Sequence, residues 1–310
     1  MRVIDETRFC KPDNLCFDSF TNKRGGSIRT ARADIPNARG TILLLTGLSE
    51  FTEKYFETIR ELNAFGFSVV TFDWASQGGS YRTHPSRPTM IYIDSFDDYL
   101  SDLDQFINRE LSNTSFFILA HSMGGHLALR YTLSHTLPTL KGIILSAPMV
   151  MIRTAEILPR FIVSPLLKIL KKFPLSFVPA GLDWSPYATP RLSGTPALTS
   201  DPHRAFIQHN WMHEVPALRL GSPSNQWLLA ALHSCACLSN ELCSYKITVP
   251  LLVCLAGDDS VVSSPSARAA LASQGRIVEI AGAKHEILME RDELRRMFFE
   301  NIYPFLETNL

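Results

Sequence analysis

Short runs rich in leucine and β-branched residues recur through the first half of the chain. Each run is bounded by turn residues, which is typical of strands joined by loops or helices. The pattern predicts strands at residues 28–33, 41–45, 67–72, 115–119 and 142–145.

Segments with a helical period lie between these strands, notably at residues 51–65 and 96–111. Alternation of strands with helices indicates a mostly parallel sheet that helices cover on both faces. The later strands are almost continuously apolar, as expected when both faces of a sheet are buried.

The pattern changes after Pro148. Residues 149–242 are rich in Pro, Trp, His and Leu, and they predict helices at residues 155–172 and 226–238 but no clear strand. This segment is therefore expected to be a helical insertion into the sheet domain.

Strand-like runs return at residues 250–255 and 276–280, and an amphipathic helix follows at residues 291–306. We therefore expect one α/β domain made of residues 1–148 and 243–310, interrupted by the insertion.

The charge composition limits the classes of binding partner to expect. The 310 residues include 30 Lys and Arg against 30 Asp and Glu, so the formal net charge is zero. A neutral chain has no overall field to attract a phosphate backbone, which argues against nucleic acid as a partner. A small or apolar partner is favoured.

Cysteine usage and the apolar runs indicate the compartment. The six cysteines are too dilute for a disulfide scaffold and form no pair of CxxC motifs, so most are expected to be free thiols. A role for Cys235, Cys237 and Cys243 in metal binding or cross-linking stays open beside the simpler reading as small buried residues. The first residues do not resemble a secretory signal, and no run of about 18 apolar residues exists. A cytoplasmic protein is expected.

The most informative segment runs from residue 116 to residue 131, where an apolar strand leads into Ser122 and then into a helix. A nucleophilic serine on such a tight turn needs small residues two positions before and two after it, so that the backbones can approach. Ala120 and Gly124 occupy these positions. The pattern predicts Ser122 as a nucleophile, with a helix-capping serine as the simpler alternative.

A serine nucleophile needs a base and an acid, which follow it in chain order in this type of fold. Asp259 follows the strand at residues 250–255, and His285 lies in the loop after the last strand. We predict Asp259 as the acid, in preference to its neighbour Asp258, and His285 as the base.

The developing oxyanion needs hydrogen-bond donors. The loop after the strand at residues 41–45 would supply the backbone N–H of Leu48, and Met123 after the serine would supply the second. Asp73 is expected to hold its own turn rather than to catalyse. No metal is expected, since His209 and His213 lack the glutamate of a zinc HExxH motif.

Taken together, the serine turn, the loop at residues 46–50, the turn at residues 73–80, and residues 259 and 282–290 resemble the lysophospholipase and monoacylglycerol lipase group of the α/β-hydrolase family. The similarity is greatest to the bacterial lysophospholipases. Thr46 and Ala120 differ from the His and Gly usual in that group.

This resemblance implies a mostly parallel eight-stranded sheet covered by helices, with residues 149–242 as a helical cap inserted before the last two strands. It implies hydrolysis of one acyl ester of a lysophospholipid or monoacylglycerol through an acyl-enzyme, without a cofactor. A short-chain carboxylesterase or an acyltransferase of the same fold is the alternative enzyme, and a non-catalytic ligand-binding homologue is the alternative from another class.

The predicted helix at residues 155–172 places Lys168, Lys171 and Lys172 beside apolar residues. We take as a hypothesis that this part of the cap makes transient contact with a membrane surface, at the inner membrane face. The alternative is a helix that packs on the catalytic domain and leaves a solvated lysine edge. The oligomeric state is not predicted.

Overall fold

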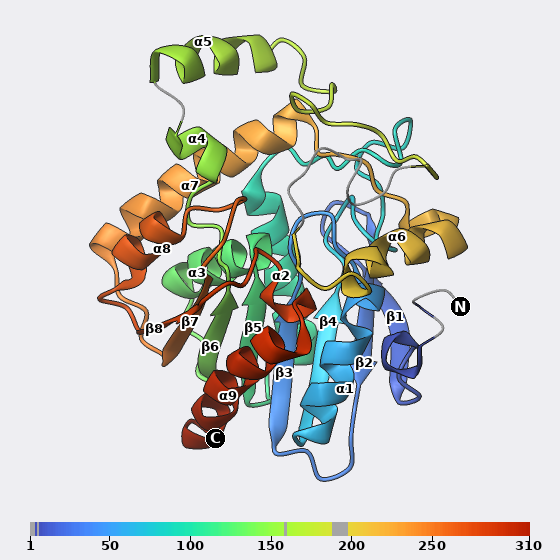
Figure 1. Cartoon of the computed structure of the whole chain (residues 1–310), viewed down its shortest axis with the longest axis vertical. Helices are drawn as coiled ribbons and strands as arrows, with labels where there is room; N and C mark the ends of the chain where they lie inside the picture. Colours follow the sequence, from blue (N-terminus) through green and yellow to red (C-terminus); the bar gives the residue numbers. More distant parts are fainter. Residues whose placement is uncertain (1–3, 5, 158–159, 188–197) are drawn as a thin grey trace.

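The chain folds around an eight-stranded sheet of order β1-β2-β4-β3-β5-β6-β7-β8, seen in a computed structural model that describes residue 4 and residues 6–157, 160–187 and 198–310 (Figure 1). The six strands from β4 to β8 in this order are parallel, and β2 runs antiparallel to both β1 and β4. The mostly parallel sheet is therefore confirmed. The strands are β1 (Leu15–Thr21), β2 (Ser27–Ala33), β3 (Gly40–Leu45), β4 (Phe67–Phe72), β5 (Phe116–His121), β6 (Leu140–Ser146), β7 (Leu251–Ala256) and β8 (Arg276–Ile280).

Strand β1 is the one strand that the hydrophobic pattern does not predict. It lies at the edge of the sheet and pairs only with β2. Five of its seven residues are exposed, so it carries no continuous apolar run. An edge strand can stay polar because only part of its surface meets the core.

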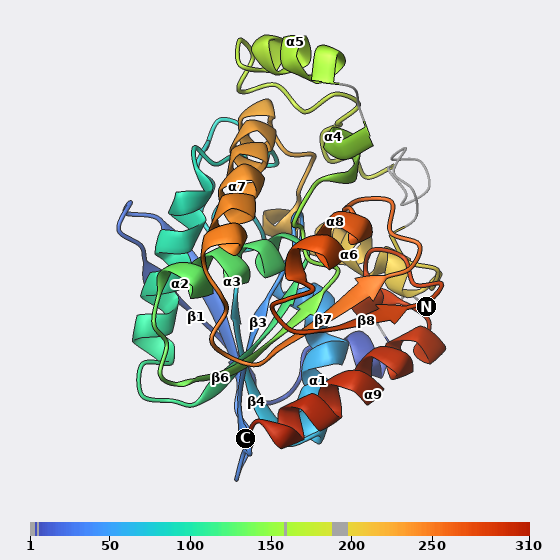
Figure 2. The same ribbon diagram turned by 90° about the vertical axis from the view of Figure 1, so that its left-hand side faces the viewer.

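Helices cover both faces of the sheet and close a separate apolar core on each (Figure 2). Alternate residues of β3 supply the two cores: Leu43 and Leu45 point to one, and Ile42 and Leu44 to the other. The helices on the first face are α2 (Phe96–Glu110), α3 (Met123–Ser134) and α8 (Ser264–Leu271), and those on the second are α1 (Phe56–Ala64) and α9 (Asp292–Thr308).

The insertion lies between β6 and β7, before the last two strands as expected. One helix is predicted at residues 155–172. Its residues 158–159 lie outside the described residues, and one helix is described on each side of them. The inserted elements are α4 (Arg153–Ile157), α5 (Arg160–Leu170), α6 (Arg204–Glu214), the short helix η4 (Pro216–Leu218) and α7 (Asn225–Ser244).

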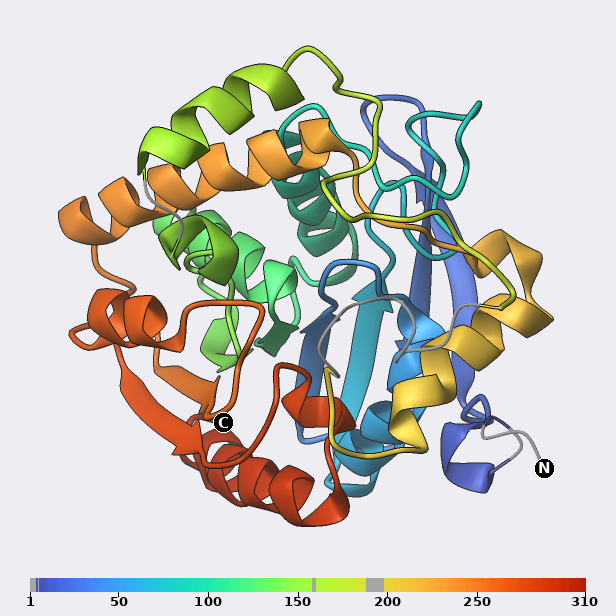
Figure 3. The ribbon, with the colours of Figure 1, turned by 45° about the horizontal axis from the view of Figure 1, so that its top comes forward.

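The inserted helices have different surroundings. In Figure 1, α5 lies farthest from the sheet, whereas α6 and α7 lie close to it. Figure 3 shows α7 and α6 on opposite sides of the carboxyl ends of the strands. Helix α7 packs against α3 and ends at Ser244, two residues beyond the predicted boundary of the insertion. Within the described parts of the chain, no helix combines the length and apolar character needed to cross a bilayer.

Helix α3 approaches β3 most closely at Gly124. A Cβ atom at this position would lie 2.6 Å from the carbonyl oxygens of Leu45 and Thr46, which are backbone atoms and cannot turn away. At the next residue, Gly125, a Cβ atom would lie 3.1 Å from the Pro148 side chain. The small residue predicted at position 124 is therefore required by the contact between helix and strand.

We expect Gly124→Ala to lower the free energy of unfolding by about 1–3 kcal/mol, because the added methyl group forces the helix away from the strand. Gly125→Ala is the matched control: its Cβ atom would stay 3.1 Å or more from every neighbouring atom, and the higher helix propensity of alanine favours it. Urea unfolding of both variants checks the prediction, and equal stability of the two would contradict it.

Candidate active site

Ser122 occupies a sharp turn between β5 and α3. Its backbone has φ 50° and ψ −114°, a region that residues other than glycine rarely adopt. Its N–H donates to the carbonyl oxygen of Ser146 on the neighbouring strand β6, at 3.0 Å. The turn places the serine at the carboxyl edge of the sheet, where α/β folds assemble their sites.

The structure brings the three predicted side chains together. The Nε2 atom of His285 lies 2.9 Å from Oγ of Ser122, and its Nδ1 atom lies 2.8 Å from Oδ2 of Asp259. All three residues are buried. The neighbouring Asp258 is exposed, and Asp259 is the aspartate that contacts His285, in agreement with the predicted pair.

Asp259 is held as a carboxylate acceptor. Its Oδ1 atom accepts the N–H groups of Val261 and Val262, at 2.8 and 3.0 Å. Burial would raise the pKa of Asp259, but the hydrogen bonds from His285 and these two amides outweigh burial and lower the pKa. The charged carboxylate therefore faces Nδ1 of His285, which leaves Nε2 to face the serine.

The loop after β3 leaves one amide free. The N–H of Gly47 donates to the Glu50 carboxylate and the N–H of Ser49 donates to Oε1 of Gln77, but in the described part of the chain no acceptor faces the N–H of Leu48 between them. Met123 is the first residue of α3, so its N–H has no acceptor within the helix. Both predicted donors are thus available to a ligand.

Four buried charged or polar side chains form a connected network beside this loop: Glu50, Lys54, Tyr55 and Glu286. Lys54 pairs with Glu50 and with Glu286, at 2.8 and 2.6 Å. Tyr55 donates its hydroxyl to Glu50 at 2.6 Å. These residues are not part of the predicted site, although two acids and a lysine inside or beside apolar segments are a signal that could have found them.

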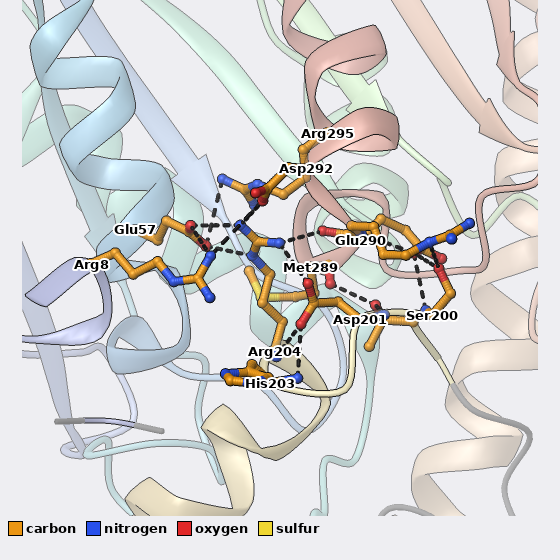
Figure 4. A network of polar contacts seen from close by, with 12 residues as sticks. Arg8, Glu57, Ser200, Asp201, His203, Arg204, Met289, Glu290, Asp292 and Arg295 are labelled. Carbon is orange, nitrogen blue, oxygen red and sulfur yellow. Dashed lines mark hydrogen bonds and ion pairs between the residues drawn. The ribbon is translucent and has the colours of Figure 1, made fainter. Parts of the chain in front are cut away.

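Helix α6 of the insertion is fixed to the sheet domain through Arg204 (Figure 4). This buried guanidinium donates two hydrogen bonds of 2.7 Å to Glu57 on α1, one of 2.6 Å to Asp292 on α9, and one to the carbonyl oxygen of Glu290. One helical turn later, Nε2 of Gln208 donates to the carbonyl oxygen of Ser49 at 2.6 Å. A residue of the insertion therefore contacts the loop that carries Leu48.

Asp73 holds its turn, as predicted. Its Oδ1 atom accepts the N–H and the hydroxyl of Thr52, and its Oδ2 atom accepts the N–H of Gly79 and an N–H of Arg29. These bonds use both carboxylate oxygens, so Asp73 joins two loops and contacts neither Ser122 nor His285.

Two further histidines lie next to the serine turn, and both are buried. His121 packs its ring 4.9 Å from the ring of His285, and it donates through Nδ1 to the carbonyl oxygen of Ser146. His126 bonds the carbonyl oxygen of Met149 and the hydroxyl of Ser234. Burial lowers the pKa of His121 to about 4 and that of His126 to about 3, so both rings are neutral at pH 7.

No metal site emerges. His209 and His213 lie with their Nε2 atoms 3.0 Å apart, and His213 also bonds the carbonyl oxygen of Pro186. Among residues whose positions the structure describes, no group of three or more His, Cys, Asp and Glu side chains is arranged to hold a metal ion. All six cysteines are free thiols.

Comparisons with known proteins show the family and the fold. The family model Hydrolase_4, described as serine aminopeptidase S33, matches residues 36–292. A Haemophilus influenzae protein named "Probable lysophospholipase L2" is 27% identical over 87% of this chain and 84% of its own length. Lysophospholipase L2 of Escherichia coli is 26% identical over 94% of this chain and 87% of its own length.

Among solved structures, a soluble variant of the Saccharomyces cerevisiae monoglyceride lipase, in complex with a substrate analogue, superposes with a TM-score of 0.74. The two are 21% identical, and the match covers 97% of this chain and 96% of the other. This likeness shows the fold, which is that of the α/β-hydrolases.

The buried His126 makes a prediction about acid stability. Its pKa falls from 6.5 in the unfolded chain to about 3 in the fold, so the unfolded state binds a proton that the folded state does not. The stability that this neutral ring contributes is complete above pH 6.5 and is lost as the pH falls toward 3. Within this window, each such ring lowers the free energy of unfolding by up to about 1.4 kcal/mol for every unit by which the pH falls.

We therefore expect His126→Gln to show a shallower loss of stability than the wild type between about pH 6 and pH 5, by about 1.2 kcal/mol over that unit. Urea unfolding at several pH values measures the slope. The exposed Asn240 offers the control, since Asn240→Ala removes no titrating group and should leave the slope unchanged. If His126→Gln and wild type lose stability in parallel, the ring is not neutral in the fold.

Proposed function

The chain belongs to the Hydrolase_4 family, the serine aminopeptidase S33 group, and on this basis we propose that it cleaves the acyl ester of a monoacyl lipid through a serine nucleophile. It is an enzyme of the carboxylic ester hydrolase class, as are relatives named lysophospholipase and monoglyceride lipase. The observation that carries the proposal is the chain of two hydrogen bonds from Ser122 through His285 to Asp259.

In the proposed reaction, Ser122 Oγ attacks the ester carbonyl carbon while Nε2 of His285 takes the hydroxyl proton. The carbonyl oxygen becomes an oxyanion and accepts the N–H groups of Leu48 and Met123. His285 then returns the proton to the departing alcohol, and an acyl-serine is left. A water molecule attacks this ester in the same way, which frees the fatty acid and restores Ser122.

Asp259 acts through His285. Its carboxylate accepts the Nδ1 proton and stabilises the imidazolium that forms during each half of the reaction. Because two backbone amides already hold the other carboxylate oxygen, Asp259 cannot turn away when the imidazole becomes charged. No cofactor takes part in any of these steps.

The substrate class is supported by the names of the relatives. Lysophospholipase and monoglyceride lipase both denote enzymes acting on a lipid with one acyl chain, and their headgroups differ. We propose a lysophospholipid or a monoacylglycerol as the substrate, with residues 149–242 as the cap over residues 1–148 and 243–310.

A surface on the cap suits contact with lipid. Helix α5 and the segment after it expose large apolar side chains: Ile169 is 55% exposed, Phe173 57% and Leu182 63%. Three exposed lysines lie among them, namely Lys168, Lys171 and Lys172. Helix α5 is also the element farthest from the sheet (Figure 1). A helix that only packed on the catalytic domain would turn its apolar residues inward, so this exposure supports transient contact with an anionic membrane surface.

The first test is fatty-acid release from lysophosphatidylcholine, lysophosphatidylethanolamine, monoacylglycerol and short p-nitrophenyl esters. We expect release from a long monoacyl lipid, and we expect Ser122→Ala to lower the rate by at least about 10³-fold while the protein stays folded. Turnover of short esters alone would reduce the function to that of a general carboxylesterase. Absence of turnover by the wild type on every ester would contradict the proposal.

The membrane contact has its own test in vesicle sedimentation with anionic lipid at low salt. Reversing the three cap lysines to glutamate should weaken binding by at least tenfold, because each basic residue near such a surface contributes about 1 kcal/mol. Hydrolysis of a short soluble ester should be unchanged. Reversal of three exposed lysines elsewhere serves as the control: Lys11, Lys23 and Lys246. Failure of the wild type to bind vesicles would overturn the hypothesis.

A further inference from the structure

Glu50, Lys54 and Glu286 form a buried cluster of charges behind the candidate site. Their exposed fractions are 2%, 3% and 8%, and the ammonium nitrogen of Lys54 lies 2.8 Å from Glu50 and 2.6 Å from Glu286. Buried ion pairs contribute little net stability, because removing charges from water costs about as much as the pairing returns. Their position therefore calls for an explanation other than stability.

Each carboxylate of the cluster belongs to a different loop of the site. Glu50 accepts the N–H of Gly47, the residue directly before Leu48. A Cβ atom at Gly47 would lie 2.9 Å from the Glu50 carboxylate and 3.0 Å from the His121 ring, so the backbone needs glycine to come this close. Glu286 follows His285 directly in the chain. Lys54 thus joins the loop of the proposed oxyanion donor to the loop of the proposed base.

Both carboxylate oxygens of Glu50 have partners. One oxygen accepts the Tyr55 hydroxyl and the Gly47 amide, and the other faces Lys54. Burial would raise the pKa of Glu50, but the Lys54 ammonium outweighs burial and holds the pKa at about 2. Glu50 is therefore charged at neutral pH.

These contacts fix the peptide groups before and after the one that carries the Leu48 N–H. Glu50 holds the N–H of Gly47, Gln77 holds the N–H of Ser49, and Gln208 holds the carbonyl oxygen of Ser49. The one amide of residues 47–49 that is left free is the N–H of Leu48, and its direction follows from its fixed neighbours. Preorganised donors of this kind stabilise an oxyanion without moving during the reaction.

We propose that Glu50 is a positioning residue that sets the direction of the Leu48 N–H through Gly47, and that Lys54 keeps this loop in register with the loop of His285. The proposal rests on the proposed function and adds to it a residue that touches neither substrate nor reacting atoms. A displacement of about 1 Å in such a group lowers the rate by up to about 10²-fold.

The test compares Glu50→Gln with the wild type. Glutamine has the same size, but only one of its two terminal atoms accepts hydrogen bonds. With its oxygen toward Tyr55 and Gly47, its NH2 group faces the Lys54 ammonium; with its oxygen toward Lys54, it loses both Tyr55 and Gly47. We expect kcat to fall by about 10- to 100-fold while KM changes by less than about threefold, since only the transition state uses the Leu48 donor.

A second readout separates positioning from general loss of structure. A long-chain trifluoromethyl ketone forms a tetrahedral adduct with a serine nucleophile and places its oxyanion on the same donors. Its affinity for Glu50→Gln should fall by the same factor as kcat, whereas the affinity for the fatty acid product should not change.

The matched control is Glu53→Gln on the same turn of chain. Glu53 is buried, with 6% of its surface exposed, and its carboxylate lies 2.6 Å from the Arg29 guanidinium. It makes no hydrogen bond or ion pair with the loop at residues 47–49 among the described residues. It should lose stability and keep its kcat. Should Glu50→Gln fail to fold, Tyr55→Phe removes one of the bonds that hold Glu50 and should lower kcat and ketone affinity together by a smaller factor.

The outcomes distinguish this inference from the function on which it rests. Wild-type kcat and ketone affinity in a folded Glu50→Gln protein would overturn the positioning role and leave the function intact. An equal loss of kcat in the Glu50 and Glu53 variants would also overturn it. A wild type that neither cleaves an ester nor binds the ketone would refute the function itself.

Discussion

The backbone of Ser122 holds a conformation that its neighbours impose on it. A positive φ at a residue other than glycine persists only where the surrounding contacts outweigh the strain. Here the N–H of Ser122 bonds Ser146 on β6, while α3 begins at the next residue and passes against the end of β3 at Gly124. The direction of the serine side chain, the position of the Met123 N–H and the start of α3 all follow from this one turn. The loops after β3, β7 and β8 then need only to bring their groups to a point that is already fixed.

Two buried cations keep those loops in place. Lys54 joins the loop after β3 to the loop after β8, and Arg204 joins α6 to α1 and α9. An apolar core could hold the same elements with equal stability, but it would tolerate small shifts in their relative positions. A charge with several acceptors at fixed distances permits one arrangement, which is what a catalytic geometry requires.

The extent to which the sequence predicts this structure varies with burial. The central strands are apolar along their whole length, and their position in the sheet follows from the alternation with helices. The positions of Ser122, Asp259 and His285 could be predicted because each lies in the turn or loop after a strand whose end is visible in the sequence. Strand β1 and helix α6 could not: β1 exposes most of its residues, and α6 buries Arg204 beside its apolar residues, which interrupts the apolar face. The contacts of Lys54 were also out of reach, since pairing with Glu286 depends on the folded positions of two distant segments.

The contacts of α6 bear on how freely the insertion can be exchanged. In the chain, α6 belongs to the same insertion as α5. Its Arg204 nevertheless bonds the sheet domain, and its Gln208 bonds the loop beside Ser122. Helix α5 makes no comparable polar contact with that domain among the side chains that the structure describes. A chimera that replaced the whole insertion with one from another hydrolase would therefore remove part of the scaffold of the site. The natural point of exchange lies before residue 198, so that α5 can diverge while α6 stays under the same constraint as the sheet.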